Sequence, residues 1–139
     1  ETYFNKKDHL WTLYEYETGQ FKLPENAEKG MIYGGCNCGN CHITISSDGD
    51  VMACRRVTDS KVANVFEDRL ADVWVCQMEK YRDYDRFEKC SKCELKAWCR
   101  GCPAVANGTS GNFYAPDPQC WKTRNEITGE ELLMEAASQ

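Results

Sequence analysis

Cys90-Ser-Lys-Cys93, followed by Cys99-Arg-Gly-Cys102-Pro103, decides the fold of this chain, because it gathers four cysteines within residues 90–102. In each CxxC pair a two-residue spacer lets both thiolates face the same metal ion or cluster. Further cysteines flank this stretch on both sides: Cys36, Cys38, Cys41, Cys54 and Cys120. Thiolates in this number suit two sites of four ligands each. The sequence therefore predicts a protein organised around soft-metal sites.

Length and composition describe a small acidic domain. The 139 residues fit one domain, and ten of the hydrophobic residues are cysteines, so the aliphatic core is expected to be modest. Part of the folding energy is then expected to come from bound metal. The formal net charge of −5 argues against nucleic acid as a partner, because phosphate recognition needs a basic surface. No apolar run reaches the ~18 residues of a membrane span, so no membrane partner is expected.

The start of the chain bears on its compartment. Residues 1–4 show neither the basic nor the apolar region of a signal peptide, and there is no initiator Met. We therefore expect a cytoplasmic protein, and a piece of a longer or processed one. A secreted disulfide protein is an alternative, but CxxC disulfides would close small loops that constrain the unfolded chain little.

Regular structure is expected to be short. Asn5 and the spacing of apolar side chains predict a helix over residues 5–16, which Gly19 ends. Residues 43–54 alternate around an Asp-Gly turn, which predicts a β-hairpin that carries Cys54 back beside Cys36–Cys41. These elements predict a small α+β, loop-rich, metal-stabilised domain.

Helices are expected in the second half. An apolar stripe predicts a helix over residues 68–83, and a second short helix is expected at residues 84–87. After Cys102 the chain is expected to form a loop through Gly111, and residues 126–138 a terminal helix or a frayed end.

The spacing of the cysteines bears on the kind of metal site. Zinc knuckles usually stand ~10 or more residues apart, whereas only five residues separate Cys93 from Cys99. An iron–sulfur cube is larger than a zinc ion and spreads its ligands further. In bacterial ferredoxins the Cys before Pro ligates the other cluster. This comparison predicts one cluster at Cys90, Cys93 and Cys99, closed by Cys120, with Cys102 crossing to the upstream cysteines.

Two longer patterns contain these cysteines. The first runs Gly35-Cys36-x-x-Gly39, then Asp48-Gly49-Asp50-Val51-x-x-Cys54, and continues through residues 62–74. The second runs Cys90-x2-Cys93-x5-Cys99-x2-Cys102 and ends at Cys120. Together they span residues 34–121 and resemble a SPASM domain. SPASM domains are C-terminal auxiliary-cluster modules of radical SAM enzymes, most of which modify peptides or proteins.

The resemblance implies two [4Fe–4S] clusters, wrapped by the hairpin and the short helices. The first would be held by Cys36, Cys54 and Cys102, with Cys38 or Cys41 as fourth ligand, and the second by Cys90, Cys93, Cys99 and Cys120. The implied function is electron relay, substrate anchoring or both. The cysteine spacing departs from the family at Arg100-Gly101, where the family has three residues before the cysteine that corresponds to Cys102.

The CxxxCxxC triad of the SAM-cleaving cluster is absent from this sequence. S-adenosylmethionine and its cluster would therefore belong to a barrel outside this chain, and no catalytic residue is assigned. Residues 1–33 would be a helix and linker to that barrel, residues 34–122 the two-cluster domain, and residues 123–139 a tail. The implied partners are the barrel of the same polypeptide, a ribosomal precursor peptide, and an electron carrier such as ferredoxin or flavodoxin.

Three alternatives remain, one for the whole chain and two for single residues. The whole chain could be a zinc-binding structural or interaction module. His42 could replace a cysteine ligand, as in Rieske-type centres, or face solvent from a strand. Cys76 lies on the apolar stripe of its predicted helix, where we expect a buried thiol that packs as a small hydrophobic side chain.

Overall fold

The computed structural model describes residues 2, 10–22 and 24–122. Its sheet has three antiparallel strands in the order β1-β2-β3, with β1 at Thr44–Ile45, β2 at Asp50–Met52 and β3 at Lys61–Asn64. Thr44 pairs with Met52, and Asp50 pairs with Asn64. The expected hairpin is therefore confirmed, and β3 adds a strand to it. Small α+β architecture is confirmed as well.

A tight turn closes the hairpin. The amide of Gly49 donates to the carbonyl of Ser46 over 3.0 Å, and the amide of Ser46 donates to the carbonyl of Asp50 over 2.9 Å. Gly49 has a φ of +83°, which a glycine adopts without strain. The Asp-Gly pair in the sequence thus predicts both the turn and its place.

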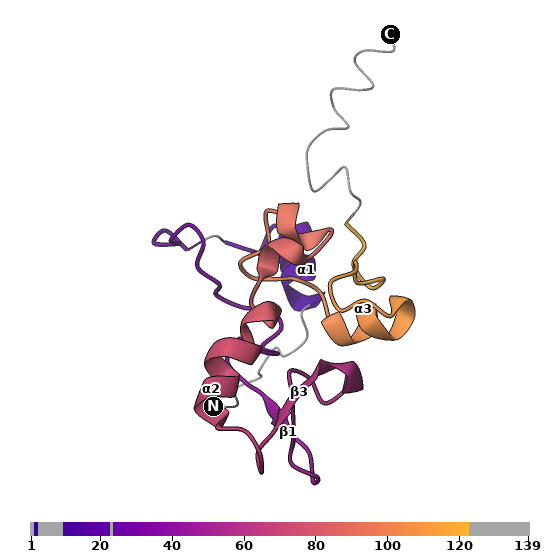
Figure 1. Cartoon of the computed structure of the whole chain (residues 1–139). Coiled ribbons are helices and arrows are strands. Elements are labelled where there is room, and N and C mark those ends of the chain that lie inside the picture. Colours follow the sequence, from indigo (N-terminus) through magenta and orange to yellow (C-terminus); the bar gives the residue numbers. More distant parts are fainter. Residues whose placement is uncertain (1, 3–9, 23, 123–139) are drawn as a thin grey trace.

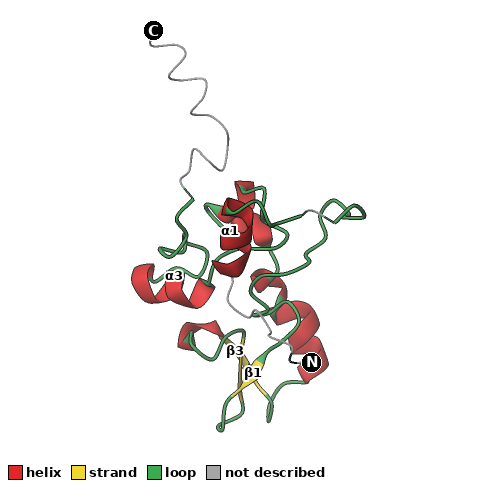
Figure 2. Ribbon diagram, turned by 180° about the vertical axis from the view of Figure 1, so that it is seen from behind, coloured by secondary structure: helices red, strands yellow, loops and turns green. Residues whose placement is uncertain are grey.

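The helical segments are short. The longer ones are α1 at Leu10–Glu17 and α3 at Pro103–Ser110, while α2 at Leu70–Asp72 continues as a π-helical turn, η2, at Val73–Gln77. Single 3₁₀ turns lie at Thr58–Ser60, before β3, and at Glu79–Tyr81, Tyr84–Arg86 and Cys90–Lys92, between η2 and α3. The sheet and α2 lie at one end of the described chain, and α1 lies nearer the other (Figures 1 and 2).

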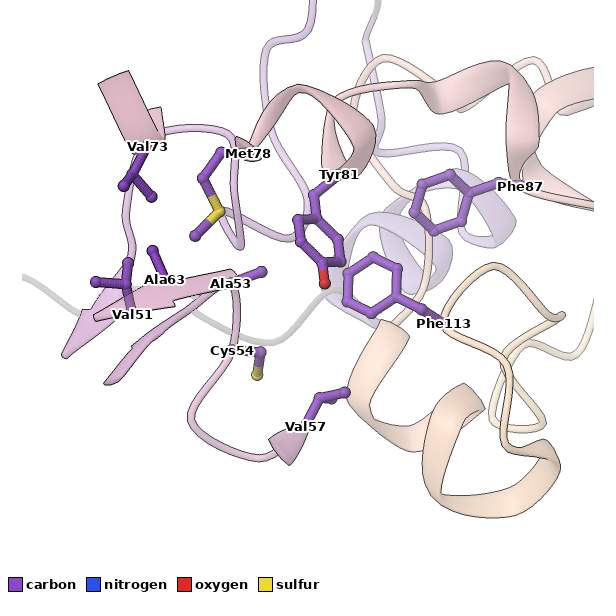
Figure 3. Close-up of a cluster of buried hydrophobic side chains, with 10 residues drawn as sticks. All are labelled: Val51, Ala53, Cys54, Val57, Ala63, Val73, Met78, Tyr81, Phe87 and Phe113. Atoms are coloured by element: carbon purple, nitrogen blue, oxygen red, sulfur yellow. The ribbon is translucent and has the colours of Figure 1, made fainter. Parts of the chain in front are cut away.

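In the part of the chain that the structure describes, two separate hydrophobic cores hold these elements. The first joins the sheet to the segment after α2 and contains Val51, Ala63, Met78, Tyr81 and Phe113. Figure 3 shows Met78 above the strand residues, with the rings of Tyr81 and Phe113 continuing the core toward Phe87. The second core is smaller and consists of Leu13, Leu95 and Cys99. Because each core is small, each buries only a modest apolar area, as the composition predicted.

The structure corrects the expectation of a loop after Cys102. Residues 103–110 form α3, with Pro103 in its first turn and Gly111 at its C-terminal end in the left-handed conformation, φ +74°. Proline at the start and glycine just past the end are typical helix boundaries. The expected single helix over residues 68–83 is instead a series of short α, π and 3₁₀ turns.

The remaining expectations have mixed outcomes. The helix over residues 5–16 is confirmed from Leu10 onward, and the short helix at residues 84–87 is confirmed as a 3₁₀ turn. The start at Asn5 and the tail at 126–138 lie outside the described residues. Within the described part of the chain, no helix is long and apolar enough to cross a membrane.

Candidate metal centre

The loop at residues 34–41 carries three of the predicted ligands and packs one of them, Cys38, against the first core. The amides of Asn40 and Cys41 donate to the carbonyl of Asn37 over 3.0 and 3.1 Å, which coils the backbone between Cys36 and Cys41. Gly39 has a φ of +68°, and a Cβ there would lie 2.6 Å from Cβ of Tyr81. Only glycine fits this close approach, so the loop is held directly against the core.

Cys54 is fixed by a buried serine. It lies just after β2, is 8% exposed and belongs to the first core. Its amide donates to Oγ of Ser60 over 3.1 Å, and the Ser60 hydroxyl lies 3.2 Å from the Cys54 carbonyl. Ser60 is itself 1% exposed. The hairpin and this serine together place Cys54 beside the loop, as the sequence predicted.

Three thiols form the first group, which we call the hairpin group: Cys36, Cys38 and Cys54. The Cys38 thiol hydrogen-bonds the Cys36 sulfur and lowers the pKa of Cys36. The same hydrogen bond, together with burial and the nearby Cys54 sulfur, raises the pKa of Cys38. Cys41 is exposed and His42 Nε2 lies 3.8 Å from Cys38 Sγ. The structure thus separates Cys38 from Cys41 by their surroundings.

Four thiols form the second group, which we call the CxxC group: Cys90, Cys93, Cys99 and Cys120. Burial, and then the neighbouring thiols Cys99, Cys93 and Cys120, raise the pKa of Cys90 to about 12. Burial also raises the pKa of Cys93 and of Cys99. Lys89 Nζ lies 3.4 Å from Cys120 Sγ, which places a positive charge at the group.

Cys102 is positioned by its backbone. Its amide donates to Oδ2 of Asp117 over 2.6 Å, and Asp117 is 3% exposed. Gly101 has a φ of +66°, and a Cβ there would lie 2.6 Å from Cβ of Asp117. The two-residue spacer Arg100-Gly101 therefore makes a turn that needs glycine. The half-buried Cys102 thiol is not among those that hydrogen-bond within the hairpin group.

Arg100 lies between the two groups. It is 3% exposed, and its guanidinium donates to the carbonyls of Gly34 and Cys36 over 2.8 and 3.2 Å. Burial lowers its pKa, while thiolates of both groups, among them Cys36 and Cys99, favour the charged form. The side chain therefore fastens the hairpin-group loop to the CxxC segment and places a positive charge near sulfurs of both.

The donor set fits an iron–sulfur cofactor. Clustered, largely buried thiols are the ligands that such clusters use, and cationic side chains beside them favour thiolate. Among residues 10–22 and 24–122, no three or more His, Cys, Asp or Glu side chains lie close enough together to hold a single metal ion. Gly39 and Gly101 let the backbone that carries the thiols approach Tyr81 and Asp117 closely.

One sequence expectation about the cysteines is wrong. Cys76 is exposed, not buried, because η2 is π-helical and turns this position outward. Its neighbour Val75 is also exposed, at 64%. Ser60, Asp117 and Tyr84 were missed by sequence reasoning. Nothing in their local pattern distinguishes them from surface residues, because their roles depend on contacts distant in the chain.

Comparison with known proteins finds a matching family model for part of the chain. Residues 36–103 match the model of the SPASM family, an iron–sulfur cluster-binding domain. This part of the chain is a SPASM domain. The resemblance noted in the sequence is therefore confirmed, and with it iron–sulfur binding as the property of the domain.

Two curated relatives extend this result. The chain is 30% identical over 108 residues to an AdoMet-dependent heme synthase of Nitratidesulfovibrio vulgaris, covering 75% of this chain and 29% of the relative. It is 30% identical over 89 residues to an AdoMet-dependent heme synthase of Methanosarcina barkeri, covering 62% of this chain and 25% of the relative. The chain thus spans less than a third of the length of either relative. Its SPASM domain is of the kind found in radical SAM enzymes. No solved structure matches it.

Proposed function

We propose that residues 34–122 are an auxiliary domain with two [4Fe–4S] clusters in a radical SAM enzyme. Cys36, Cys38, Cys54 and Cys102 would hold the first cluster, with Cys41 as the alternative to Cys38. The second would be held by Cys90, Cys93, Cys99 and Cys120. The observation that supports this division is that the thiols interact electrostatically in two sets, with Arg100 near sulfurs of both.

The structure favours Cys38 over Cys41 as a ligand. Cys38 hydrogen-bonds Cys36 and neighbours Cys54, whereas the Cys41 side chain is exposed. Cys102 would join the first cluster by a modest rotation or shift of its turn, because Arg100 already ties that turn to the carbonyl of Cys36 over 3.2 Å. This arrangement gives the first cluster two ligands from one loop and two from distant segments.

When bound, the clusters supply one-electron transfer, or an iron atom that anchors substrate where a ligand position stays open. The chain's own residues hold and shield them. Lys89 and Arg100 place positive charge at the sulfurs, which favours the more negative, reduced form of a cluster. Asp117 fixes the backbone at Cys102, and Ser60 fixes it at Cys54.

The wider setting that we propose is the one that the family suggests. A radical SAM barrel in the same polypeptide would cleave S-adenosylmethionine, and a ferredoxin or flavodoxin in the cytoplasm would exchange electrons with the clusters. The chain spans 29% of one relative, so that relative has ample length for such a barrel. The N-terminal segment, which we assign to the linker, packs through Leu13 against Leu95 and Cys99.

A ribosomally made precursor peptide is the first candidate substrate, because the enzymes that the sequence resembles mostly modify peptides or proteins. A tetrapyrrole is the second, because both curated relatives are AdoMet-dependent heme synthases. The full-length protein, reduced and given S-adenosylmethionine, should convert one of two probes. One is a synthetic peptide encoded beside its gene, and the other is an iron tetrapyrrole. A mass change in the peptide alone supports a peptide-modifying enzyme. A mass change in the tetrapyrrole alone contradicts that candidate and supports the second one.

Metal analysis tests the cofactor itself. The chain is purified without oxygen, reconstituted with iron and sulfide, and assayed for iron, sulfide and zinc. Two clusters predict about eight iron and eight sulfide per chain. The competing function is a zinc-dependent structural or interaction module. A colourless chain with stoichiometric zinc and no sulfide would support that module and contradict the proposal.

A further inference from the structure

Tyr84 has a buried hydroxyl without a hydrogen-bond partner. Its residue begins the 3₁₀ turn Tyr84–Arg86, and its half-buried ring packs against the first core, stacked on Phe87 with 6.4 Å between ring centres. Among the buried side-chain nitrogen and oxygen atoms of the described residues, Oη of Tyr84 is the one that lacks a partner. An unpaired buried hydroxyl costs about 1–3 kcal/mol, so its retention calls for an acceptor that the protein alone does not provide.

Arg100 holds this ring at the hairpin group. The guanidinium carbon lies 4.6 Å from the centre of the Tyr84 ring, in a cation–π contact. The same guanidinium donates to the carbonyls of Gly34 and Cys36. One buried side chain therefore contacts both the phenol ring and the loop that carries Cys36, and moving the ring away would break its cation–π contact with Arg100.

The electrostatics agree with this placement. Burial raises the pKa of Tyr84; the positive charges of Arg100 and Arg82 oppose this rise, and the sulfurs of Cys36 and Cys41 add to it. The hydroxyl is therefore a proton donor at neutral pH, within the field of this loop's thiolates. Sulfur atoms of a thiolate-bound cluster accept hydrogen bonds, which are among the protein's means of setting a cluster's potential.

We propose that Tyr84 donates a hydrogen bond to a sulfur of the cluster at the hairpin group and thereby raises the reduction potential of that cluster. This inference rests on the proposed function, because it needs a cluster there. One added electron makes the cluster more negative, and a donated hydrogen bond then stabilises the reduced form more than the oxidised one. The effect belongs to the first cluster, since Arg100 orients the ring toward the loop of Cys36.

The test compares two tyrosine variants of the full 139-residue chain. Tyr84→Phe removes the hydroxyl and keeps the ring for its contacts with Arg100 and Phe87. Tyr114→Phe is the matched control, because Tyr114 is also half-buried beside the first core, but its hydroxyl donates to the Lys80 carbonyl and accepts from Arg86. Each variant is reconstituted, assayed for iron and sulfide, and titrated with dithionite while EPR is recorded.

We expect Tyr84→Phe to keep full iron and sulfide and to lower the equilibrium constant for reduction of one centre by about fivefold, the effect of one hydrogen bond. That centre should be the one whose signal is lost in Cys54→Ser. The other centre, and both centres of Tyr114→Phe, should titrate as in the unmodified chain. Unchanged potentials in Tyr84→Phe, or equal shifts in both variants, overturn the role of Tyr84 while the clusters stand. Absence of iron and sulfide from the unmodified chain overturns the proposed function instead.

Discussion

Cys38 and Cys41 stand three positions apart, yet their side chains have different surroundings. Cys38 lies against the first core and hydrogen-bonds Cys36, while Cys41 is exposed. The sequence alone makes these two equal candidates, because both lie within the same glycine- and asparagine-rich stretch. Only the turn around Asn37, which folds the loop back on itself, distinguishes them.

The first prediction separates the two cysteines. Cys38→Ser should lose about half of the iron and sulfide, because one of two clusters loses a buried ligand. Cys41→Ser should retain nearly all of both. Cys76→Ser is the matched control, since Cys76 is exposed and lies outside both thiol groups. Loss of iron from Cys41→Ser with full loading of Cys38→Ser would reverse the assignment.

The second prediction concerns the turn before Cys102. Gly101→Ala should destabilise the iron-loaded chain by about 2 kcal/mol or more, because the residue is left-handed and its new Cβ would overlap Asp117. Thermal unfolding followed by circular dichroism should show a Tm lower by roughly 5–10 °C.

Gly108 supplies the control for this substitution. It lies inside α3, and the methyl group that alanine adds there would have no neighbouring atom within 4 Å. Gly108→Ala should therefore leave Tm unchanged or raise it, because alanine favours the helix over glycine. Equal losses in the two alanine variants would show that the left-handed turn at Gly101 does not position Cys102.

The surroundings of several other residues were not predicted, because the local sequence does not show them. Cys76 was expected inside a regular helix, but the π-helical turn rotates it to the surface. Tyr84 and Asp117 have no periodic signal, because their partners Arg100 and Cys102 lie far along the chain. The nine candidate ligands are predicted from cysteine spacing and the family resemblance, whereas neither indicates Ser60 or Asp117, which position the backbone at Cys54 and Cys102.

At the scale of elements, the sheet positions Cys54. The chain leaves β2, makes the 3₁₀ turn Thr58–Ser60 and returns as β3. Ser60 closes this connection, with its Oγ near the amide of Cys54 and the carbonyls of Cys54 and Val57. The alternation of side chains and the Asp-Gly turn predict the hairpin. They do not predict the third strand, because Lys61–Asn64 has only four residues and buries only one of them fully.

The third prediction tests that closure. Ser60→Ala should cost about 1–3 kcal/mol, because it leaves the buried amide of Cys54 without an acceptor. The cluster of the hairpin group should be lost on exposure to a chelator several times faster than in the unmodified chain. Thr58→Ala, at an exposed position in the same turn, is the control and should change neither rate nor Tm. Identical chelator kinetics in both variants would contradict a positioning role for Ser60.

The helix α3 shows how composition can mislead. Residues 107–110, Asn-Gly-Thr-Ser, are typical of a loop, but Pro103 and Gly111 mark helix boundaries. Thr109 and Ser110 satisfy their hydroxyls on the carbonyls of Val105 and Ala106. The boundary signals therefore outweigh the low helix propensity of the interior, helped by the burial of Ala106.

At the scale of the whole molecule, two small cores and two thiol groups are interleaved. Cys54 belongs to the first core and Cys99 to the second, so each core ends at a proposed cluster. Tyr16 donates to Glu94, which also pairs with Lys122 over 2.9 Å, and this network joins α1 to the second core. Bound metal would therefore add stability to both halves.

The fourth prediction concerns pH in the metal-free chain. Burial raises the pKa of Cys90 to about 12, from the ordinary value of 9.0, so the folded thiol stays neutral over a range where the unfolded one ionises. The stability that this group contributes is complete below pH 9 and is lost as pH rises from 9 to about 12. Equilibrium unfolding across this range should show the decline, and Cys90→Ala should show less of it. A decline of equal slope in the variant would refute the assignment to Cys90.

The central claim, two clusters on two separate thiol groups, is tested most directly by EPR of the dithionite-reduced chain and its cysteine variants. The unmodified chain should show two [4Fe–4S] signals with about eight iron and eight sulfide. Cys54→Ser should remove one signal and Cys99→Ser the other, each with about half of the iron. A single signal that both substitutions abolish together, or zinc in place of iron, would contradict the account.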